Sequence, residues 1–274
     1  MNKYSLLVLV TLYVSNIGGN LRAAPVEPVV RYQGPISSAG VARLERELTG
    51  RGQTLVITSE GGNGFAAIRM ASLIRARGVK VVADKYCMSG CASHILPAGY
   101  SSIVKPNTFV AFHNTMTSTY LVARSLDPEL AERRYAAAAR AELDLYRKLK
   151  INPILLTLPV FRMGPVCAFV LRAKDGKSQD VLYITKNKVY LPGRALLGAY
   201  GYPAAAQLPA SESEMRNAFR LNLPPTLQLT VRADFASADR SVTALQIEQA
   251  LTNLPVCTAE AQRTALSAWR PPPD

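Results

Sequence analysis

Hydrophobic and polar positions follow two different periods in the first part of the chain. Residues 41–48 place apolar side chains at helical spacing, and residues 54–59 (TLVITS) form a short apolar, β-branched run typical of a buried strand. Helical spacing returns over residues 65–77, and residues 79–83 (VKVVA) resemble a second strand. A strand, a helix and a strand of these lengths predict a parallel crossover unit, and the loops at its strand ends lie where α/β proteins build their sites.

The pattern beyond this unit predicts more strands and helices. A turn of small residues (86–93) leads into a short helix that Pro97 ends. Asp127, as a cap, and Pro128, at the first helical position, open a long Ala-rich helix that runs to about residue 150. The remaining predicted elements are strands 102–104 and 108–112, a hairpin of 167–173 with 181–185, a strand at 227–231, and helices at 242–254 and 258–269.

The N-terminus predicts export. Lys3 provides a positive charge, residues 5–14 are apolar, and Ala23 and Ala24 are small. The apolar run is shorter than the roughly 20 residues of a membrane span, so we interpret residues 1–24 as a signal peptide, with an uncleaved anchor as the alternative. The mature protein is then soluble and periplasmic or secreted. Residues 25–203 are assigned to one α/β domain and residues 204–274 to a C-terminal extension of unassigned role.

Composition adds a strong positive charge. The 274 residues include 32 Lys and Arg against 19 Asp and Glu, a net charge of +13, and 49% of the chain is hydrophobic. That hydrophobic content excludes a disordered chain. The plain interpretation of the charge is a solvated, Arg-rich surface, and the alternative is contact with an anionic membrane surface. Basic runs interleaved with aromatic residues are missing, so specific nucleic-acid binding is not expected.

Four cysteines allow two disulfides in an oxidising compartment. Three pairings are open. Cys87 and Cys91 lie within one helical turn, which favours a bridge between them and leaves Cys167 to pair with Cys257. Buried free thiols are the alternative. Structural zinc is not favoured, because the Cys-x3-Cys pair has no second ligand pair at suitable spacing, and no metal or cofactor is expected.

Several candidate catalytic residues follow predicted strands. A glycine loop after residues 54–59 includes Gly62, whose N–H can turn towards an anion. Ser89 lies in the turn after the next strand, with Gly90 as its neighbour, which is the arrangement that acyl transfer needs. His113 ends the apolar strand TFVAFH and is the candidate base, whereas the rival His94 is predicted to face away from Ser89.

Taken in order, these features resemble the Clp-protease/crotonase superfamily. Strand, Gly-Gly and helix are followed by strand, Ser-Gly and helix, then by strands that end in His and by a long helix. This order resembles the Clp protease proteolytic subunit, and more closely its exported bacterial relatives with a Cys-x-Ser-x-Cys turn, over roughly residues 54–203. The resemblance implies a spiral of ββα units with a long handle-type helix, which in that family assembles homo-oligomeric rings, and here a small C-terminal α+β extension. It also implies Ser89 as nucleophile, His113 as base, and Gly62 and Gly90 as oxyanion donors.

The third catalytic residue and the activity follow from the same resemblance. Asp180, before the short strand VLYIT, is the nearest match to the family's aspartate, with Asp175 and Asp144 as alternatives. The implied function is a serine hydrolase, an ATP-independent exported peptidase acting on peptides or proteins. One alternative is an inactive binding module that keeps the fold. Another is an acyl-CoA enzyme of the crotonase branch, which would need catalytic carboxylates in place of a Ser/His pair.

Overall fold

The computed structural model describes residues 28–172, 178–224, 229–235 and 241–268. The predicted signal peptide and Asp175 lie outside these described residues. A parallel sheet forms the centre of the molecule, with strand order β1-β2-β3-β4 and with β5 also paired to β3. Its strands are β1 (Val29–Gln33), β2 (Thr54–Ser59), β3 (Lys80–Met88), β4 (Ser102–Val104) and β5 (Phe109–Ala111). The predicted α/β class with a parallel sheet is confirmed.

Strand β3 is longer than the sequence predicted, because it has two successive partners on one side. Its first half pairs with β4 and its second half, from Tyr86 to Met88, pairs with β5. Between the halves Lys85 has a φ of 63°, and the register against β2 shifts after Ile57. Pairing with β5 keeps the chain in the sheet up to Met88. Ser89 therefore leaves the sheet at the carboxyl end of β3.

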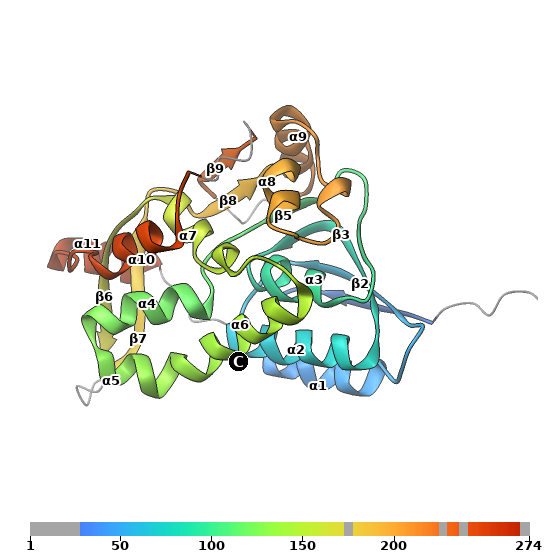
Figure 1. Cartoon of the computed structure of the whole chain (residues 1–274), viewed down its shortest axis with the longest axis horizontal. Coiled ribbons are helices and arrows are strands. Elements are labelled where there is room, and N and C mark those ends of the chain that lie inside the picture. The colour runs from blue at the N-terminus through green and yellow to red at the C-terminus, as the bar shows by residue number, and fades with distance from the viewer. Residues whose placement is uncertain (1–27, 173–177, 225–228, 236–240, 269–274) are drawn as a thin grey trace, which may run out of the picture.

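Helices α1 (Ser38–Glu47) and α2 (Gly64–Arg77) cover one face of the sheet, and α6 (Ala136–Leu149) packs against α2 (Figure 1). Asn63 caps the helix that follows β2, and Gly78, with a φ of 58°, ends it. The Asp127 carboxylate accepts the Leu130 N–H, which confirms the predicted cap of the long helix. These elements are α1 (Ser38–Glu47), α2 (Gly64–Arg77), η1 (Cys91–Ile95), α3 (Leu96–Ala98), α4 (Met116–Leu126), α5 (Pro128–Leu130), η2 (Ala131–Tyr135), α6 (Ala136–Leu149), η3 (Pro153–Leu156) and α7 (Leu158–Met163).

The rest of the chain packs onto this centre. The predicted hairpin is present as an antiparallel pair, β6 with β7, and a second, parallel pair joins β8 to β9. Leu208, Ile247 and Leu251 belong to the same hydrophobic core as the central sheet, so residues after 203 share the core of the residues before them. The elements are β6 (Pro165–Arg172), β7 (Ser178–Thr185), β8 (Val189–Pro192), α8 (Arg194–Ala199), η4 (Ala205–Gln207), α9 (Glu212–Asn222), β9 (Val231–Asp234), α10 (Ala244–Thr252) and α11 (Ala259–Ala268).

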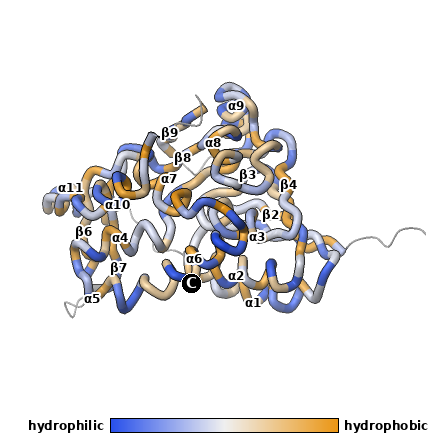
Figure 2. Tube along the Cα trace, in the orientation of Figure 1, coloured by the Kyte–Doolittle hydropathy of each residue, from blue (hydrophilic) through white to orange (hydrophobic). Residues whose placement is uncertain are grey.

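Hydrophobic residues recur along the strands and alternate with hydrophilic residues along the helices, and the buried ones form the main core (Figure 2). The Ala-rich helix follows this rule, since Ala138, Ala139, Leu145 and Tyr146 of α6 are buried within the chain. None of the helices in the described ranges is long and apolar enough to cross a membrane.

Candidate active site

The serine turn has an unusual backbone conformation. Ser89 follows β3 directly and has a φ of 52°, in the left-handed region that non-glycine residues rarely adopt. Its N–H donates to the Ala111 carbonyl at 2.8 Å, and its own carbonyl accepts the Ser93 N–H at 2.8 Å. The hydrogen bonds to Ala111 and Ser93 therefore hold the strained turn, as in the strand-to-helix elbows that expose a nucleophile. The half-buried Ser89 hydroxyl makes no hydrogen bond with another described residue.

The glycine loop after β2 packs directly against this serine. Gly61 and Gly62 have φ values of 93° and 147°. A Cβ on Gly61 would lie 2.5 Å from the Ser89 Cβ and 3.1 Å from its Oγ, and a Cβ on Gly62 would lie 2.3 Å from the Ile36 carbonyl oxygen. Only glycine fits at either position, because a side chain would need a strained backbone and would collide with its neighbour. The loop thus brings its backbone close to the Ser89 side chain.

The backbone N–H groups of Gly62 and Gly90 lie in the two loops that meet at Ser89. The Ile36 N–H donates to the Gly61 carbonyl at 2.7 Å, and the Ile36 carbonyl accepts the Asn63 N–H at 2.9 Å. This pairing directs the Gly62 N–H away from Ile36. Gly90 precedes η1, where the first N–H groups of a helix have no partner within it. Within the described part of the chain, neither the Gly62 nor the Gly90 N–H donates a hydrogen bond. Such N–H groups are the kind that stabilise an oxyanion.

His113 lies at the same edge of the sheet as Ser89. Strands β3 and β5 run parallel with Met88 opposite Ala111, and the intervening Phe112 is fixed by two backbone hydrogen bonds to Tyr190 at 2.8 and 2.9 Å. Burial, and then the positive charge of Lys188, lower the pKa of His113 to about 4, although a hydrogen bond with Asn114 opposes the shift. The imidazole is therefore neutral at pH 7, the form that accepts a proton. Ser89 and His113 share no hydrogen bond in this structure.

The Asp180 carboxylate is engaged by residues other than His113. Its carboxylate accepts the Tyr135 hydroxyl and the Val181 N–H, and it pairs with Arg134 at 3.3 Å. Burial, followed by the hydrogen bond with Asp180, raises the pKa of Tyr135. Across the described ranges, no carboxylate forms an ion pair with His113. The structure therefore brings Ser89, Gly62, Gly90 and His113 to one edge and does not bring Asp180 to the imidazole.

The other candidates also have assigned places. Asp144 is exposed and pairs with Arg147 at 2.7 Å, as expected of a surface charge. His94 is buried and its Nε2 lies 2.7 Å from a carboxylate oxygen of Glu142, which is completely buried. Sequence reasoning missed Glu142. The signal was its position on the stripe formed by the buried α6 residues, where an unpaired carboxylate would be costly.

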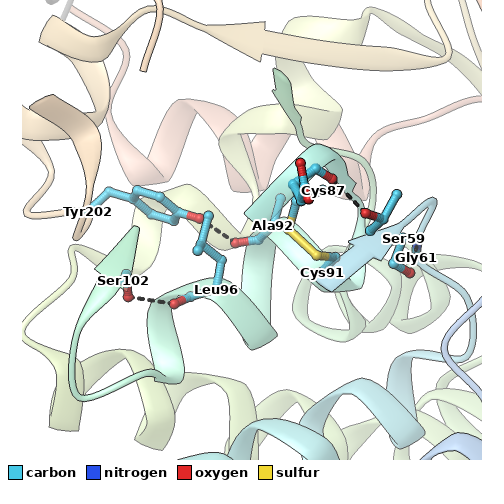
Figure 3. Close-up of a disulfide and its surroundings, with 10 residues drawn as sticks. Ser59, Gly61, Cys87, Cys91, Ala92, Leu96, Ser102 and Tyr202 are labelled. Atoms are coloured by element: carbon cyan, nitrogen blue, oxygen red, sulfur yellow. Dashed lines mark hydrogen bonds between the residues drawn. A yellow bond between two sulfur atoms is a disulfide. The ribbon is translucent and has the colours of Figure 1, made fainter. Parts of the chain in front are cut away.

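Both favoured disulfides are present. Cys87 and Cys91 are bonded, with Cα atoms 5.2 Å apart, and the bridge spans the serine turn (Figure 3). Cys167 and Cys257 are bonded, with Cα atoms 5.0 Å apart, and they tie the loop before α11 to β6. The first bridge closes the chain on either side of Ser89, so the turn is held covalently as well as by hydrogen bonds.

Comparisons with known proteins leave the family open. No protein-family profile matches the sequence, and no curated protein matches it. A search of solved structures finds, among others, a mutant of ClpP1 from Listeria monocytogenes, with 18% sequence identity and a TM-score of 0.36. The alignment covers 44% of this chain and 71% of that one.

Proposed function

We propose that this chain is a serine hydrolase that cleaves peptides, with Ser89 as nucleophile and His113 as general base. The observation that carries the proposal is the strained turn at Ser89, which packs against the Gly61–Gly62 backbone at the same sheet edge as a neutral histidine. A serine alone is a weak nucleophile at neutral pH, and an adjacent base is what activates it. Peptide as the substrate class rests on the resemblance of these loops to the Clp protease proteolytic subunit.

The reaction uses the described groups in a fixed order. The Ser89 Oγ attacks the peptide carbonyl carbon while its proton passes to the His113 imidazole, and the Gly62 and Gly90 N–H groups stabilise the oxyanion. The C–N bond then breaks, and the imidazolium gives its proton to the leaving amine. A water molecule next attacks the acyl-serine as His113 accepts its proton, and the serine is restored when that proton returns. Asp180 has no part in this scheme, because its carboxylate is engaged by Tyr135 and Arg134.

We further propose that the protein is exported to an oxidising compartment such as the periplasm. The two disulfides are compatible with that location, since such bridges persist in oxidising compartments and are rare in the cytosol. No unfolding motor is proposed, so the expected substrates are short or unstructured peptides that can reach the site without ATP.

Turnover of unstructured fluorogenic peptides by the full chain, produced in an oxidising compartment, tests the hydrolase proposal. The Ser89→Ala variant should lose turnover at least a thousandfold, because a triad-type nucleophile contributes several orders of magnitude to rate. Ser213→Ala, which changes an exposed serine on α9, is the matched control and should keep full activity. Equal turnover by the wild type and the Ser89→Ala variant would refute the proposal.

A peptide-binding module without turnover is the second candidate. It is favoured by one observation, that His113 pairs with no carboxylate among the described residues and shares no hydrogen bond with Ser89. Such a module would bind peptides with equal affinity in the wild type and the Ser89→Ala variant, and neither would cleave them. Titration of a labelled peptide by fluorescence anisotropy, run beside the turnover assay, separates the two candidates.

A further inference from the structure

A buried histidine–carboxylate pair lies behind the serine turn, and the proposed mechanism does not use it. His94 has a relative exposure of 2% and Glu142 of 0%, and the Nε2 of the imidazole lies 2.7 Å from a Glu142 oxygen. Burial of two ionisable side chains is expensive even when they are paired, and apolar residues of similar size are often at least as stable. The pair therefore calls for an explanation beyond stability.

Both oxygens of Glu142 are fully engaged. One accepts from His94 and from the Met116 N–H at 2.9 Å. The other accepts the N–H and the hydroxyl of Thr117, each at 2.7 Å. Met116 and Thr117 are the first residues of α4, so the carboxylate satisfies two N–H groups that the helix itself leaves without partners. It also places a negative charge at the positive end of the α4 dipole.

These partners belong to the two segments that carry the proposed catalytic groups. His94 lies in η1, a π-helical turn that begins two residues after Ser89. Met116 lies three residues after His113. One carboxylate on α6 thus joins the helix behind the nucleophile to the helix behind the base.

The second nitrogen of His94 supports a role in orientation. Nδ1 is buried and has no hydrogen-bond partner among the residues that the structure describes. A Cβ on Gly90 would lie 3.9 Å from that atom, so the ring packs against the residue next to Ser89. A buried polar atom without a partner costs stability. An apolar side chain at position 94 would avoid that cost, so stability alone does not explain the imidazole there.

We propose that Glu142, acting through His94 and the start of α4, is a positioning residue that sets the relation between Ser89 and His113. It does indirectly what the carboxylate of a catalytic triad does by touching the base. This inference rests on the proposed hydrolase function. Neither His94 nor Glu142 is proposed to touch substrate, and the Glu142 side chain is completely buried.

Kinetics of the Glu142→Gln variant test the proposal. The amide keeps the size of the side chain, but its NH2 group cannot accept the hydrogen bonds of Met116 or Thr117. We expect kcat to fall about 10- to 100-fold, the effect of misplaced catalytic groups, with KM changed less than about twofold. Asp144→Asn, an exposed change two residues along the same helix, is the control and should leave kcat unchanged.

A pair of variants at position 94 separates positioning from proton transfer and keeps the test informative if Glu142→Gln fails to fold. His94→Gln retains an N–H donor for Glu142 and should keep most of kcat, whereas His94→Leu should lose it. Equal, severe losses of kcat in both variants would overturn the positioning role and identify His94 as a base. Wild-type kcat in His94→Leu, or in a folded Glu142→Gln, would overturn the inference and leave the hydrolase proposal intact. A wild type that cleaves nothing overturns the proposed function and this inference with it.

Discussion

Acidification should destabilise this protein through His113 in a way that can be measured. Its pKa is lowered from 6.5 to about 4 in the folded chain, chiefly by burial. Between these two pH values the unfolded chain binds a proton that the folded chain does not bind. The unfolding free energy must therefore fall as the pH drops from about 6.5 to 4. Below pH 4 the contribution of His113 stays constant, because both states then bind the proton. At 1.36 kcal/mol per pKa unit, the loss is about 3 kcal/mol at most.

The assay compares the wild type with His113→Gln, which lacks the titrating group. Urea unfolding at pH 7 and pH 4 should show that the wild type loses about 3 kcal/mol more than the variant does, because the carboxylates that also titrate are common to both. NMR titration gives the pKa directly, since the chain has only two histidines and the variant identifies the signal. Lys188→Gln should raise the His113 pKa, because it removes the second cause of the shift. A His113 pKa near 6.5, with equal losses in both proteins, would refute the description of a half-buried, cation-flanked imidazole.

Three further predictions follow from the same geometry. Hydrolysis should keep its rate from pH 7 down to about 5 and fall only near pH 4, as His113 becomes protonated, so an acid limb centred near pH 7 would contradict the assigned base. Replacing Cys167 and Cys257 by Ser should lower the unfolding free energy by about 4 to 5 kcal/mol in urea unfolding, since the bridge closes a separation of 90 residues, and an unchanged midpoint would contradict this. Gly61→Ala should abolish turnover in a protein that still folds, because the new Cβ would collide with Ser89, and retained kcat would show that the loop does not pack as described.

The sequence pattern predicted the central elements well where the signal was local. The strands Thr54–Ser59 and Ser102–Val104 have the expected bounds, and the disulfides follow the pairing that spacing favoured. These features depend on short apolar runs and on separation along the chain, which can be read directly. The parallel arrangement also followed, because a helix between two strands leaves few other connections.

Elements that depend on distant partners were missed. No strand was predicted over Val29–Gln33, yet these residues form an edge strand because β2 supplies their hydrogen bonds. Helix α4 was also missed, since its Thr- and Ser-rich start has weak helical preference and its first N–H groups are bound by Glu142, which is distant in the sequence. The boundary placed at residue 203 marks a change in composition, whereas residues on both sides of it share one core.

The candidate site was predicted in part for the same reason. Ser89, Gly62, Gly90 and His113 each follow a strand or strand-end loop, so the parallel sheet brings them to one edge without any long-range information. The position of Asp180 depends on how the β6–β7 hairpin packs on η2, which no local pattern encodes, and there Tyr135 and Arg134 bind it.

The central claim is that Ser89 is an activated nucleophile, and covalent labelling tests it most directly. The folded wild-type protein would be treated with a fluorophosphonate at pH 7, and the adduct located by mass spectrometry of its peptides, with His113→Gln as the variant that lacks the base. The account predicts a single adduct on Ser89 that forms much more slowly in the variant. A folded wild type that remains unlabelled, or one labelled at another serine, would contradict it.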